Sequence, residues 1–201
     1  ILMRKDPPFD MRYVFATYVL ELAADKTFVM NNPKSLRDAN EKMFTLQFPD
    51  LIPDAIVTAM HSEIIEFLRA HGGEGVAKPL DGAGGEGIFY LNVEDQNHNA
   101  IIESVTHHGS QFAMVQAYLP AIRETGDHRL ILLNGEVLGG VARMPPTGDL
   151  RGNIHVGGRC EKMELTPREM EICETLAPRL REDGLYFVGI DVIRGFLTEV
   201  N

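Results

Sequence analysis

The feature that most constrains this chain is a lysine followed by a glycine-rich loop, Lys78-Pro79-Leu80-Asp81-Gly82-Ala83-Gly84-Gly85-Glu86-Gly87. Short apolar runs flank it at 75–77 and 88–91, so the pattern predicts a strand, a loop and a second strand. Four glycines within six positions let the backbone turn tightly and bring its N–H groups close to a ligand. Together with the ammonium group of Lys78, these amides would form a cradle for phosphate.

Two familiar phosphate-binding motifs do not fit this order of residues. In a P-loop the lysine follows the glycines, and in the dinucleotide-binding fingerprint the loop opens a helix instead of a strand. Taken alone, the loop is equally consistent with a flexible hairpin turn whose lysine is solvated, so the other motifs have to decide.

The composition is that of a globular protein with its own core. Of 201 residues, 44% are hydrophobic and 24% charged, and no apolar run reaches the length that crosses a membrane. The formal net charge of −10 argues against a protein that coats nucleic acid or an anionic membrane. The two cysteines, Cys160 and Cys173, form neither a disulfide framework nor a metal-binding pattern, which favours a reducing, cytoplasmic location.

The order of the expected elements indicates two lobes of the α+β class. Residues 53–115 run strand, helix, strand, strand, helix, strand around the glycine-rich loop. A hinge at 116–120 leads to a second lobe, in which two alternating runs flank Asn134-Gly135, a strong signal for a β-hairpin. We divide the chain into 1–32, the end of a preceding domain and a linker; 33–118, a small lobe; and 119–201, a large lobe. Because both ends read as interior positions, we expect a longer chain that has been truncated on each side.

A helix is expected to begin at Asn32-Pro33, because Asn is a good N-cap and Pro suits the first turn. Its apolar face would carry Leu36, Ala39, Met43 and Leu46. Lys42 falls off this face, so periodicity alone predicts a solvated lysine on the surface.

The last expected hairpin, 186–193 and 196–200, carries Asp191 and Glu199, and Asn201 follows it. Glu199 and Asn201 are two residues apart and share one face of a strand. A three-residue loop, 194–196, would place Asp191 opposite Glu199, whereas a two-residue loop would place it opposite Thr198. Like charges facing each other destabilise a sheet, so two carboxylates and an amide oxygen on one face suggest a site for Mg²⁺. The alternative is an ordinary charged hairpin at a sheet edge.

Residues 144–159 form a long segment without periodicity that carries four glycines. Loops of this length in a compact domain commonly act as lids. Arg143, Arg151 and Arg159 lie on the segment or at its ends, and in so acidic a chain they indicate anion binding. For Arg151 and Arg159 a solvated loop is the alternative, whereas Arg143 ends an expected strand and is held more firmly.

Five motifs follow one another in a fixed order, at 78–85, 116–120, 127–129, 142–143 and 191–201. This series resembles the ATP-grasp superfamily and is most similar to the bacterial glutathione synthetase family. The segments 2–10, 32–38 and 151–159 resemble that family in particular, and the likeness covers nearly the whole chain. Ala83 departs from the pattern, because a larger residue is usual at this position of the loop.

The resemblance implies an ATP-grasp fold that holds ATP between the antiparallel sheets of two lobes, with 144–159 closing as a lid. For ATP it implies Lys42, Lys78, Gly82, Gly84 and Gly85 at the phosphates, Gln116 and Leu119 at adenine, and Asp127 at the ribose. For the metal, Mg²⁺ or alternatively Mn²⁺, it implies Asp191, Glu199 and Asn201. It implies Arg129 and Arg143 as catalytic residues, and Arg4, Arg151 and Arg159 as candidates for substrate binding.

The activity that the resemblance implies is that of an ATP-dependent carboxylate-amine ligase, a glutathione synthase. The carboxylate of γ-glutamylcysteine would be phosphorylated, and glycine would attack the acyl phosphate to give glutathione, ADP and phosphate. Positioning and charge neutralisation would supply the catalysis without a protein nucleophile. The resemblance also implies a cytoplasmic homo-oligomer that acts on small molecules, without nucleic acid or a membrane as partner. Two alternatives are another ATP-grasp carboxylate-amine ligase and a non-catalytic ATP-binding module.

Overall fold

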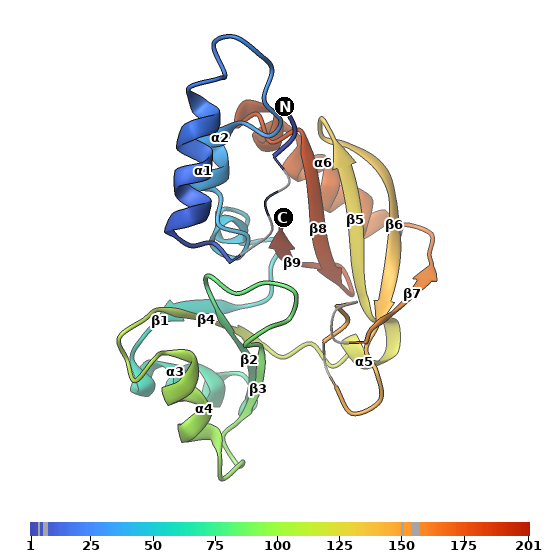
Figure 1. Ribbon diagram of the computed structural model, residues 1–201. Helices are drawn as coiled ribbons and strands as arrows, with labels where there is room; N and C mark the ends of the chain where they lie inside the picture. Colours follow the sequence, from blue (N-terminus) through green and yellow to red (C-terminus); the bar gives the residue numbers. More distant parts are fainter. Residues whose placement is uncertain (4, 6–7, 150, 154–156) are drawn as a thin grey trace.

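The protein consists of two lobes, each built around one antiparallel sheet, in a computed structural model (Figure 1). The structure describes residues 1–3, 5, 8–149, 151–153 and 157–201. Arg4 and part of the expected lid, 150 and 154–156, therefore lie outside the described residues. The α+β class and the two antiparallel sheets expected from the sequence are confirmed.

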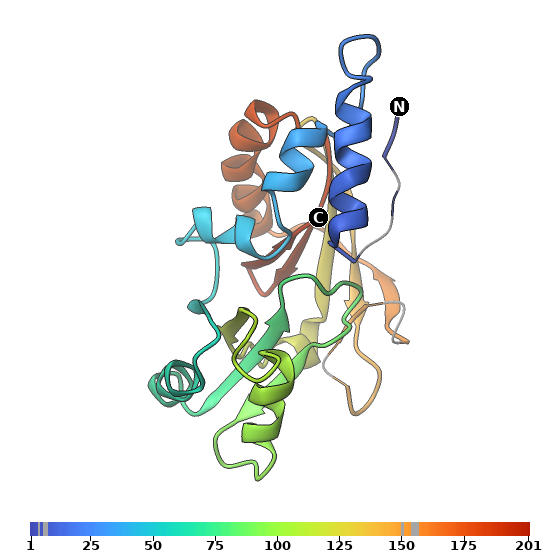
Figure 2. The same ribbon diagram turned by 60° about the vertical axis from the view of Figure 1, so that its left-hand side comes forward.

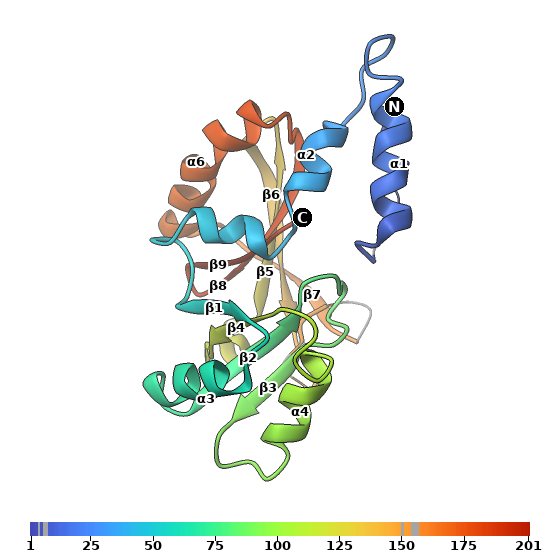
Figure 3. The same cartoon turned by 90° about the vertical axis from the view of Figure 1, so that its left-hand side faces the viewer.

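The small lobe contains a sheet with the strand order β1-β4-β2-β3 within the described residues. Its strands are β1 (Ala55–Thr58), β2 (Glu74–Pro79), β3 (Phe89–Asn92) and β4 (Ala113–Ala117). The helices α3 (His61–Ala70) and α4 (His98–Val105) cover one face of the sheet, as Figure 3 shows. The two helices pack on the strands through the buried side chains of Ile64 and Leu68 from α3 and Ile102 from α4. This packing holds β2, whose end leads into the glycine-rich loop.

The large lobe contains a sheet with the order β7-β6-β5-β8-β9 among the described residues. Its strands are β5 (Asp127–Leu133), β6 (Glu136–Met144), β7 (Arg159–Lys162), β8 (Phe187–Ile193) and β9 (Phe196–Val200). The short helix α5 (Ile122–Thr125) precedes β5, and α6 (Pro167–Glu182) packs on the sheet through Ile172, Leu176 and Leu180. The hairpin expected at Asn134-Gly135 is confirmed, and both residues have positive φ, as a tight two-residue turn requires.

The helix expected from 32 to 46 is wrong in its second half. It divides into α2 (Pro33–Asp38) and the 3₁₀ helix η1 (Met43–Gln47). Between them the side-chain oxygen of Asn40 accepts hydrogen bonds from the backbone N–H groups of Lys42 and Met43, which competes with helical bonding. Phe44 and Leu51 pack into the core of the large lobe. Packing therefore joins 33–52 to the large lobe, whereas the sequence-based division placed these residues in the small lobe.

The N-terminal part of the chain lies beside the large lobe (Figure 2). Its helix α1 (Met11–Glu21) begins at the N-cap Asp10 and is held to α2 by Arg37, whose guanidinium lies 4.1 Å from the ring centre of Tyr18. Leu2 forms a parallel bridge with Met30. Among the described residues, no helix combines the length and the apolar character needed to span a membrane.

The packing predicts that Ile190→Ala destabilises the large lobe strongly. Ile190 is fully buried in the middle of β8, so removing its side chain leaves a cavity and should lower the free energy of unfolding by about 2–5 kcal/mol. Urea denaturation followed by circular dichroism measures this loss. Leu138→Ala on the solvent side of β6 is the control, with a change of about 0.5 kcal/mol or less. Equal losses in the two variants would contradict the assignment of the core.

Candidate functional site

Two lysines connect the lobes where the sheets approach each other. The ammonium group of Lys78, at the end of β2, lies 3.5 Å from a carboxylate oxygen of Glu199 on β9. The ammonium group of Lys42 donates to the carbonyl oxygen of Gly82 at 2.7 Å and to the carboxylate of Glu41. Lys42 is only 2% exposed, so the prediction of a solvated surface lysine from periodicity is wrong. The ammonium group of Lys42 therefore stands beside the glycine-rich loop, and Lys78 directly precedes the loop in the chain.

Two arginines and two aspartates form a buried charge cluster in the large sheet. Arg129 and Asp191 are direct partners across β5 and β8, and Asp127 and Arg143 are direct partners across β5 and β6. Arg129 Nη2 lies 2.9 Å from Asp191 Oδ2, and Arg143 Nη2 lies 2.8 Å from Asp191 Oδ1. Arg143 also binds the carboxylate of Asp127. The register of the sheet alone thus brings these four predicted site residues together.

The C-terminal hairpin places Asp191 opposite Glu199, although not by either route considered from the sequence. Its loop has two residues, Arg194 and Gly195, both with positive φ, so Ile193 pairs with Phe196. A bulge at Thr198 then shifts the register by one residue. The hydroxyl of Thr198 donates to the backbone oxygen of Asp191 at 3.1 Å and closes the bulge. The predicted pairing is confirmed, and the three-residue loop is wrong.

The electrostatics separate the acidic groups of the site. Burial alone would raise the pKa of Asp191, but the guanidinium groups of Arg129 and Arg143 lower it below its ordinary value. Burial and the nearby charge of Asp191 raise the pKa of Asp127 to about 7. Burial, together with the charge of Glu199, also raises the pKa of Glu41. The site thus holds one carboxylate, Asp191, whose ionised form is already stabilised. An additional positive charge would stabilise the ionised forms of Asp127 and Glu41.

Buried polar atoms without a hydrogen-bond partner gather at this site. Among the described residues, those found in side chains are Nε2 of Gln116, Oδ1 of Asp127 and Nε of Arg143. Such atoms are costly in a folded protein and call for a ligand or water. Gln116 lines a cavity of about 60 Å³ with Val76 and Leu119. All three residues with unpaired atoms were predicted to belong to the site.

The two predicted loops contact each other. Arg151 donates from Nη1 to the carbonyl oxygen of Gly85 at 3.3 Å. A Cβ atom at Gly85 would lie 2.7 Å from Oδ1 of Asn153, so a side chain at this position would have to displace Asn153. Gly84 and Gly85 both adopt positive φ, which gives the loop its sharp turn.

One of the predicted substrate-binding arginines, Arg159, is not brought to the site. Arg159 lies on the edge strand β7, where its side chain is exposed and pairs with Glu161 at 3.8 Å. An edge strand with solvent on its outer side leaves such a side chain no buried partner. Arg4 lies outside the described residues, so the structure places only Arg151 of this group.

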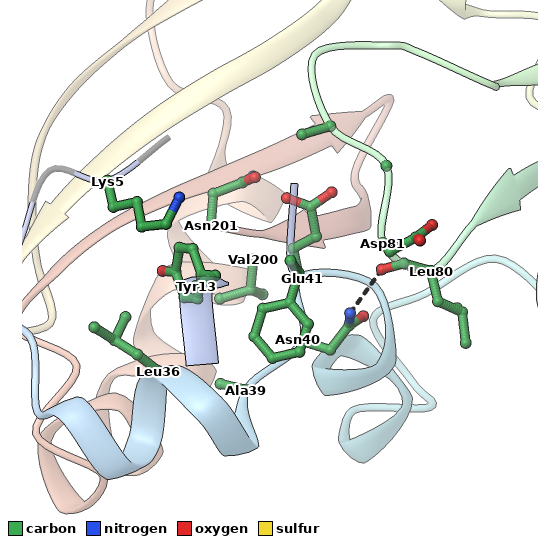
Figure 4. Close-up of a pocket in the computed structure, with 13 residues that line it drawn as sticks. Lys5, Tyr13, Leu36, Ala39, Asn40, Glu41, Leu80, Asp81, Val200 and Asn201 are labelled. Carbon is green, nitrogen blue, oxygen red and sulfur yellow. Dashed lines mark hydrogen bonds between the residues drawn. The ribbon is translucent and has the colours of Figure 1, made fainter. Parts of the chain in front are cut away.

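Sequence reasoning missed Asn40 and Glu41, which precede Lys42. Asn40 donates from Nδ2 to the carbonyl oxygen of Leu80 at 2.7 Å, which ties the glycine-rich loop to the large lobe. The backbone oxygen of Glu41 accepts from the N–H of Val200 at 2.8 Å. Asn40 and Glu41 both line a cavity of about 290 Å³ between α1, the glycine-rich loop and the end of β9 (Figure 4). In the sequence, these two residues could have been noticed only because they directly precede Lys42, which the resemblance assigns to phosphate.

The residues predicted to hold a metal fit a hard cation by their chemistry. Asp191 and Glu199 face each other, and the amide nitrogen of Asn201 lies 3.4 Å from Asp191 Oδ2. Carboxylate and amide oxygens are the donors that Mg²⁺ and Mn²⁺ accept. Within the described part of the chain, no group of three His, Cys, Asp or Glu side chains has the geometry of a metal site. The predicted set would therefore need the amide of Asn201 and oxygens from a ligand to complete it.

Solved structures share this fold. D-cycloserine synthetase DcsG superposes with a TM-score of 0.73 at 16% identity, over 95% of this chain and 71% of its own. A D-alanine–D-alanine ligase from Bacillus anthracis complexed with ATP gives a TM-score of 0.65 at 16% identity, over 92% and 62% of the two chains. At such low identities the likeness concerns the fold alone. A family model over residues 41–201 assigns this fold to the ATP-grasp class.

Two family models match the chain: the prokaryotic glutathione synthetase ATP-grasp domain over residues 41–201 and the prokaryotic glutathione synthetase N-terminal domain over residues 1–37. The chain belongs to the prokaryotic glutathione synthetase family. It is 54% identical to a glutathione synthetase of Thermosynechococcus vestitus, over all of this chain and 63% of the relative. It is 50% identical to one of Photorhabdus laumondii subsp. laumondii, over 100% and 64%. The chain thus spans less than two thirds of the length of these relatives.

The raised pKa of Asp127 predicts a pH-dependent stability. Between its ordinary value of 3.8 and its folded value of about 7, the folded protein binds more protons than the unfolded chain. The contribution of Asp127 to the free energy of unfolding is therefore full below about pH 4 and is lost as the pH rises through about 7.

Urea denaturation of wild type and Asp127→Asn at about pH 5 and about pH 8 measures this contribution. Wild type should lose at least about 1 kcal/mol more than the variant over this interval. Parallel losses in the two proteins would show that Asp127 is ionised at both pH values, against the raised pKa.

Proposed function

We propose that this chain carries the nucleotide-binding and phosphoryl-transfer machinery of a ligase that joins γ-glutamylcysteine to glycine at the expense of ATP, releasing ADP and phosphate. The observation that supports it best is the convergence of three unpaired buried polar atoms, on Gln116, Asp127 and Arg143, with two lysines beside a glycine-rich loop. Membership of the glutathione synthetase family supports the choice of substrates.

ATP lies between the lobes in this proposal. Adenine enters the cavity of about 60 Å³, where Gln116 and Leu119 present polar groups to its edge. The unpaired oxygen of Asp127 accepts a ribose hydroxyl. Lys42 and Lys78 neutralise the phosphates, and the backbone N–H groups at Gly82, Gly84 and Gly85 surround them. The ammonium of Lys42 then exchanges the carbonyl of Gly82 for a phosphate oxygen.

Asp191, Glu199 and Asn201 are the residues that would hold Mg²⁺, or Mn²⁺ in its place. When bound, the metal supplies positive charge that neutralises the phosphate oxygens during transfer. In the structure Asp191 already bonds to Arg129 and Arg143. Arg129 and Arg143 therefore lie beside the carboxylate that would hold the metal, where their guanidinium groups would face the transferring phosphoryl group.

The catalytic contribution of the protein is charge neutralisation and positioning. Arg129 and Arg143 stabilise the negative charge of the acyl phosphate and of the transition states on either side of it. Arg151, already in contact with the glycine-rich loop, helps to close the segment 144–159 over the intermediate and keeps water out. Arg159 lies on an exposed edge strand and has no part in this proposal, whereas Arg4 lies outside the described residues and stays a prediction for substrate binding.

Phosphate release from ATP by the natural full-length protein tests the function. It should require Mg²⁺, γ-glutamylcysteine and glycine together, with each omitted in turn as a control. Glu199→Gln removes a metal-binding charge and should reduce kcat by about a hundredfold or more. Glu66→Gln, exposed on α3, removes the same charge far from the site and should act like wild type. Release that ignores either organic substrate would refute the ligase and leave another acceptor or a non-catalytic ATP-binding module.

The unpaired amide of Gln116 predicts opposite effects on folding and on nucleotide affinity. Gln116→Met removes a buried donor without a partner, so the free energy of unfolding should stay level or rise by up to about 1–3 kcal/mol. The dissociation constant for ATP should increase about three- to tenfold, because a hydrogen bond to the base is lost. Thermal unfolding and equilibrium titration with ATP measure the two quantities. Unchanged affinity would exclude the side chain of Gln116 from base recognition.

A further inference from the structure

An ion pair on the helix-covered face of the large sheet has no role so far. His128 lies on β5 between Asp127 and Arg129, so its side chain points to the opposite face of the sheet from these two site residues. Leu130, which shares the face of His128, packs in the core with α6. There the ring of His128 bonds through Nδ1 to the carboxylate of Glu169 on α6, a residue that is only 1% exposed.

The His128 ring contacts two groups that can only accept a hydrogen bond. Its Nδ1 atom faces Oε1 of Glu169, and its Nε2 atom lies 3.1 Å from the carbonyl oxygen of Thr125. A neutral imidazole carries a single N–H group and could serve only one of them. The proton between the ring and Glu169 belongs to the ring, because imidazole is more basic than a carboxylate. The geometry therefore requires the imidazolium form, in which both nitrogens donate.

The charges around the ring favour the same form. The hydrogen bond to Glu169 raises the pKa of His128 above its ordinary value, although burial acts against it. Burial alone would raise the pKa of Glu169, but the bonds from His128 and Thr166 lower it. The charge of Asp127, on the same strand as the ring, also favours the cation.

The remaining groups near the ring are uncharged or exposed in the described part of the chain. Ala142 on β6 and Val192 on β8 flank it in the ladders. Cys173, one turn beyond Glu169 on α6, stays neutral because burial raises the pKa of its thiol to about 11. The charged residues of α5 and β7 are exposed; they are Arg123, Glu124, Arg159, Glu161 and Lys162.

The two bonds of the ring hold the chain on both sides of Asp127. Thr125 ends α5, and Gly126 turns the chain into β5 with a φ of 75°. A Cβ atom at Gly126 would lie 2.7 Å from the backbone oxygen of Arg143, so this turn sits tightly against β6. The ring of His128 reaches back over the turn to Thr125 and also bonds to α6. Asp127 therefore lies between two anchored residues.

Glu169 is itself fixed before it meets the ring. Its Oε2 atom accepts from the backbone N–H of Thr166 at 2.7 Å and from the hydroxyl of Thr166 at 2.8 Å, which closes the capping box at the start of α6. The carboxylate also stands at the end of the helix where a negative charge is favoured. The contact therefore locates His128 relative to α6.

We propose that His128 is a positioning residue of the ligase: its protonated ring ties the start of β5 to α5 and α6, and so holds Asp127 and Arg129 in the proposed site. Loss of the proton leaves one of the two bonds unmade and leaves Glu169 buried without a cation, so β5 is held less firmly. The inference rests on the proposed function for the reaction, but the protonation of the ring and its effect on ATP binding can be measured without turnover.

NMR of the ring nitrogens in the isotope-labelled, natural full-length protein tests the protonation directly. The signal of His128 is assigned by its absence in His128→Asn. At pH 6.5, where an ordinary histidine is half protonated, the ring should carry both protons. Its folded pKa is raised, so its contribution to stability is full below pH 6.5 and is lost as the pH rises through the folded value. A ring that is half protonated or less at pH 6.5 would overturn the inference.

Two variants separate the charge of His128 from its shape. His128→Asn keeps a donor near the position of Nδ1 but loses the charge and the bond to Thr125. Its kcat should fall about three- to tenfold, and its dissociation constant for ATP should rise about threefold. His128→Lys keeps the cation and should stay within about threefold of wild type in kcat. Each assay is run well below the thermal unfolding midpoint of the variant, so that unfolding does not enter the comparison.

The pH profile supplies a readout that a purely structural role would not change. The ratio of wild-type kcat to that of His128→Lys should decline in the alkaline range, because the lysine stays charged up to about pH 10 whereas the ring loses its proton earlier. A ratio that does not depend on pH would overturn the inference. This comparison remains available if His128→Asn does not fold.

His71→Asn is the matched control. The ring of His71 also lies between a carbonyl oxygen, that of Phe67 at 2.8 Å, and a carboxylate, that of Asp54 at 3.1 Å. It belongs to the small lobe, and the side chain of Asp54 is 79% exposed, so His71→Asn should match wild type in kcat and in its pH profile.

ATP binding distinguishes failure of this inference from failure of the proposed function. If the full-length protein binds ATP without ligase activity, the proposed function fails, and the affinity for ATP still tests His128. Weaker ATP binding in His128→Asn than in His71→Asn supports the positioning role. Equal affinity in these two variants overturns it, and so do equal losses of kcat in His128→Asn and His128→Lys, because the charge of the ring would then be irrelevant.

Discussion

The sharing of Asp191 between two guanidinium groups is the interaction on which the rest of the site depends. A buried carboxylate is costly unless paired, and Asp191 is paired twice, with Arg129 from one neighbouring strand and with Arg143 from the strand beyond it. Replacing such a cluster by apolar residues would often stabilise a fold. Its presence therefore supports the proposal that Arg129 and Arg143 act in catalysis, since that role requires charge to be held at one place in the sheet.

Strand β5 brings the charged residues together because it pairs with both β6 and β8. Asp127 and Arg129 lie two residues apart on one face of it and find their partners on β6 and β8 at equivalent positions of the ladders. Three strands thus contribute to one cluster with no loop involved. Loops enter only at the rim, where the glycine-rich loop and the segment that carries Arg151 meet through Gly85. The rigid part of the site holds the charges, and the loops cover it.

The sequence was sufficient for those features that local patterns encode. The order of strands and helices in the small lobe and the turn at Asn134-Gly135 were predicted. The pairing of Asp191 with Glu199 was expected only for a three-residue loop, which is not the loop observed. The failures concern competition between local and distant contacts. Periodicity placed Lys42 on the surface because it cannot detect that Asn40 interrupts the helix and turns the lysine inward.

The same limit explains the remaining differences. A bulge is a property of two strands together, so the hairpin sequence alone could not distinguish a three-residue loop from a two-residue loop followed by an extra residue. Glu41 could not be recognised because its partners, Lys42 apart, come from β9 and from a cavity formed by distant segments. Arg159 was assigned by its motif, and the sequence does not reveal that its strand forms the edge of the sheet.

The bulge at Thr198 has a geometric consequence for how the two lobes work together. Thr198 lines the small cavity beside Gln116, and its neighbour Glu199 faces Asp191, so successive residues border the places proposed for the base and for the metal. Adjacent Cα atoms are separated by about 3.8 Å whatever the rest of the molecule does. The large lobe therefore keeps the spacing between these two positions fixed, while Val76, Lys78 and Gln116 line the same cavity from the small lobe. Any change in the distance between the lobes would alter the width of this cavity but not the spacing between Thr198 and Glu199.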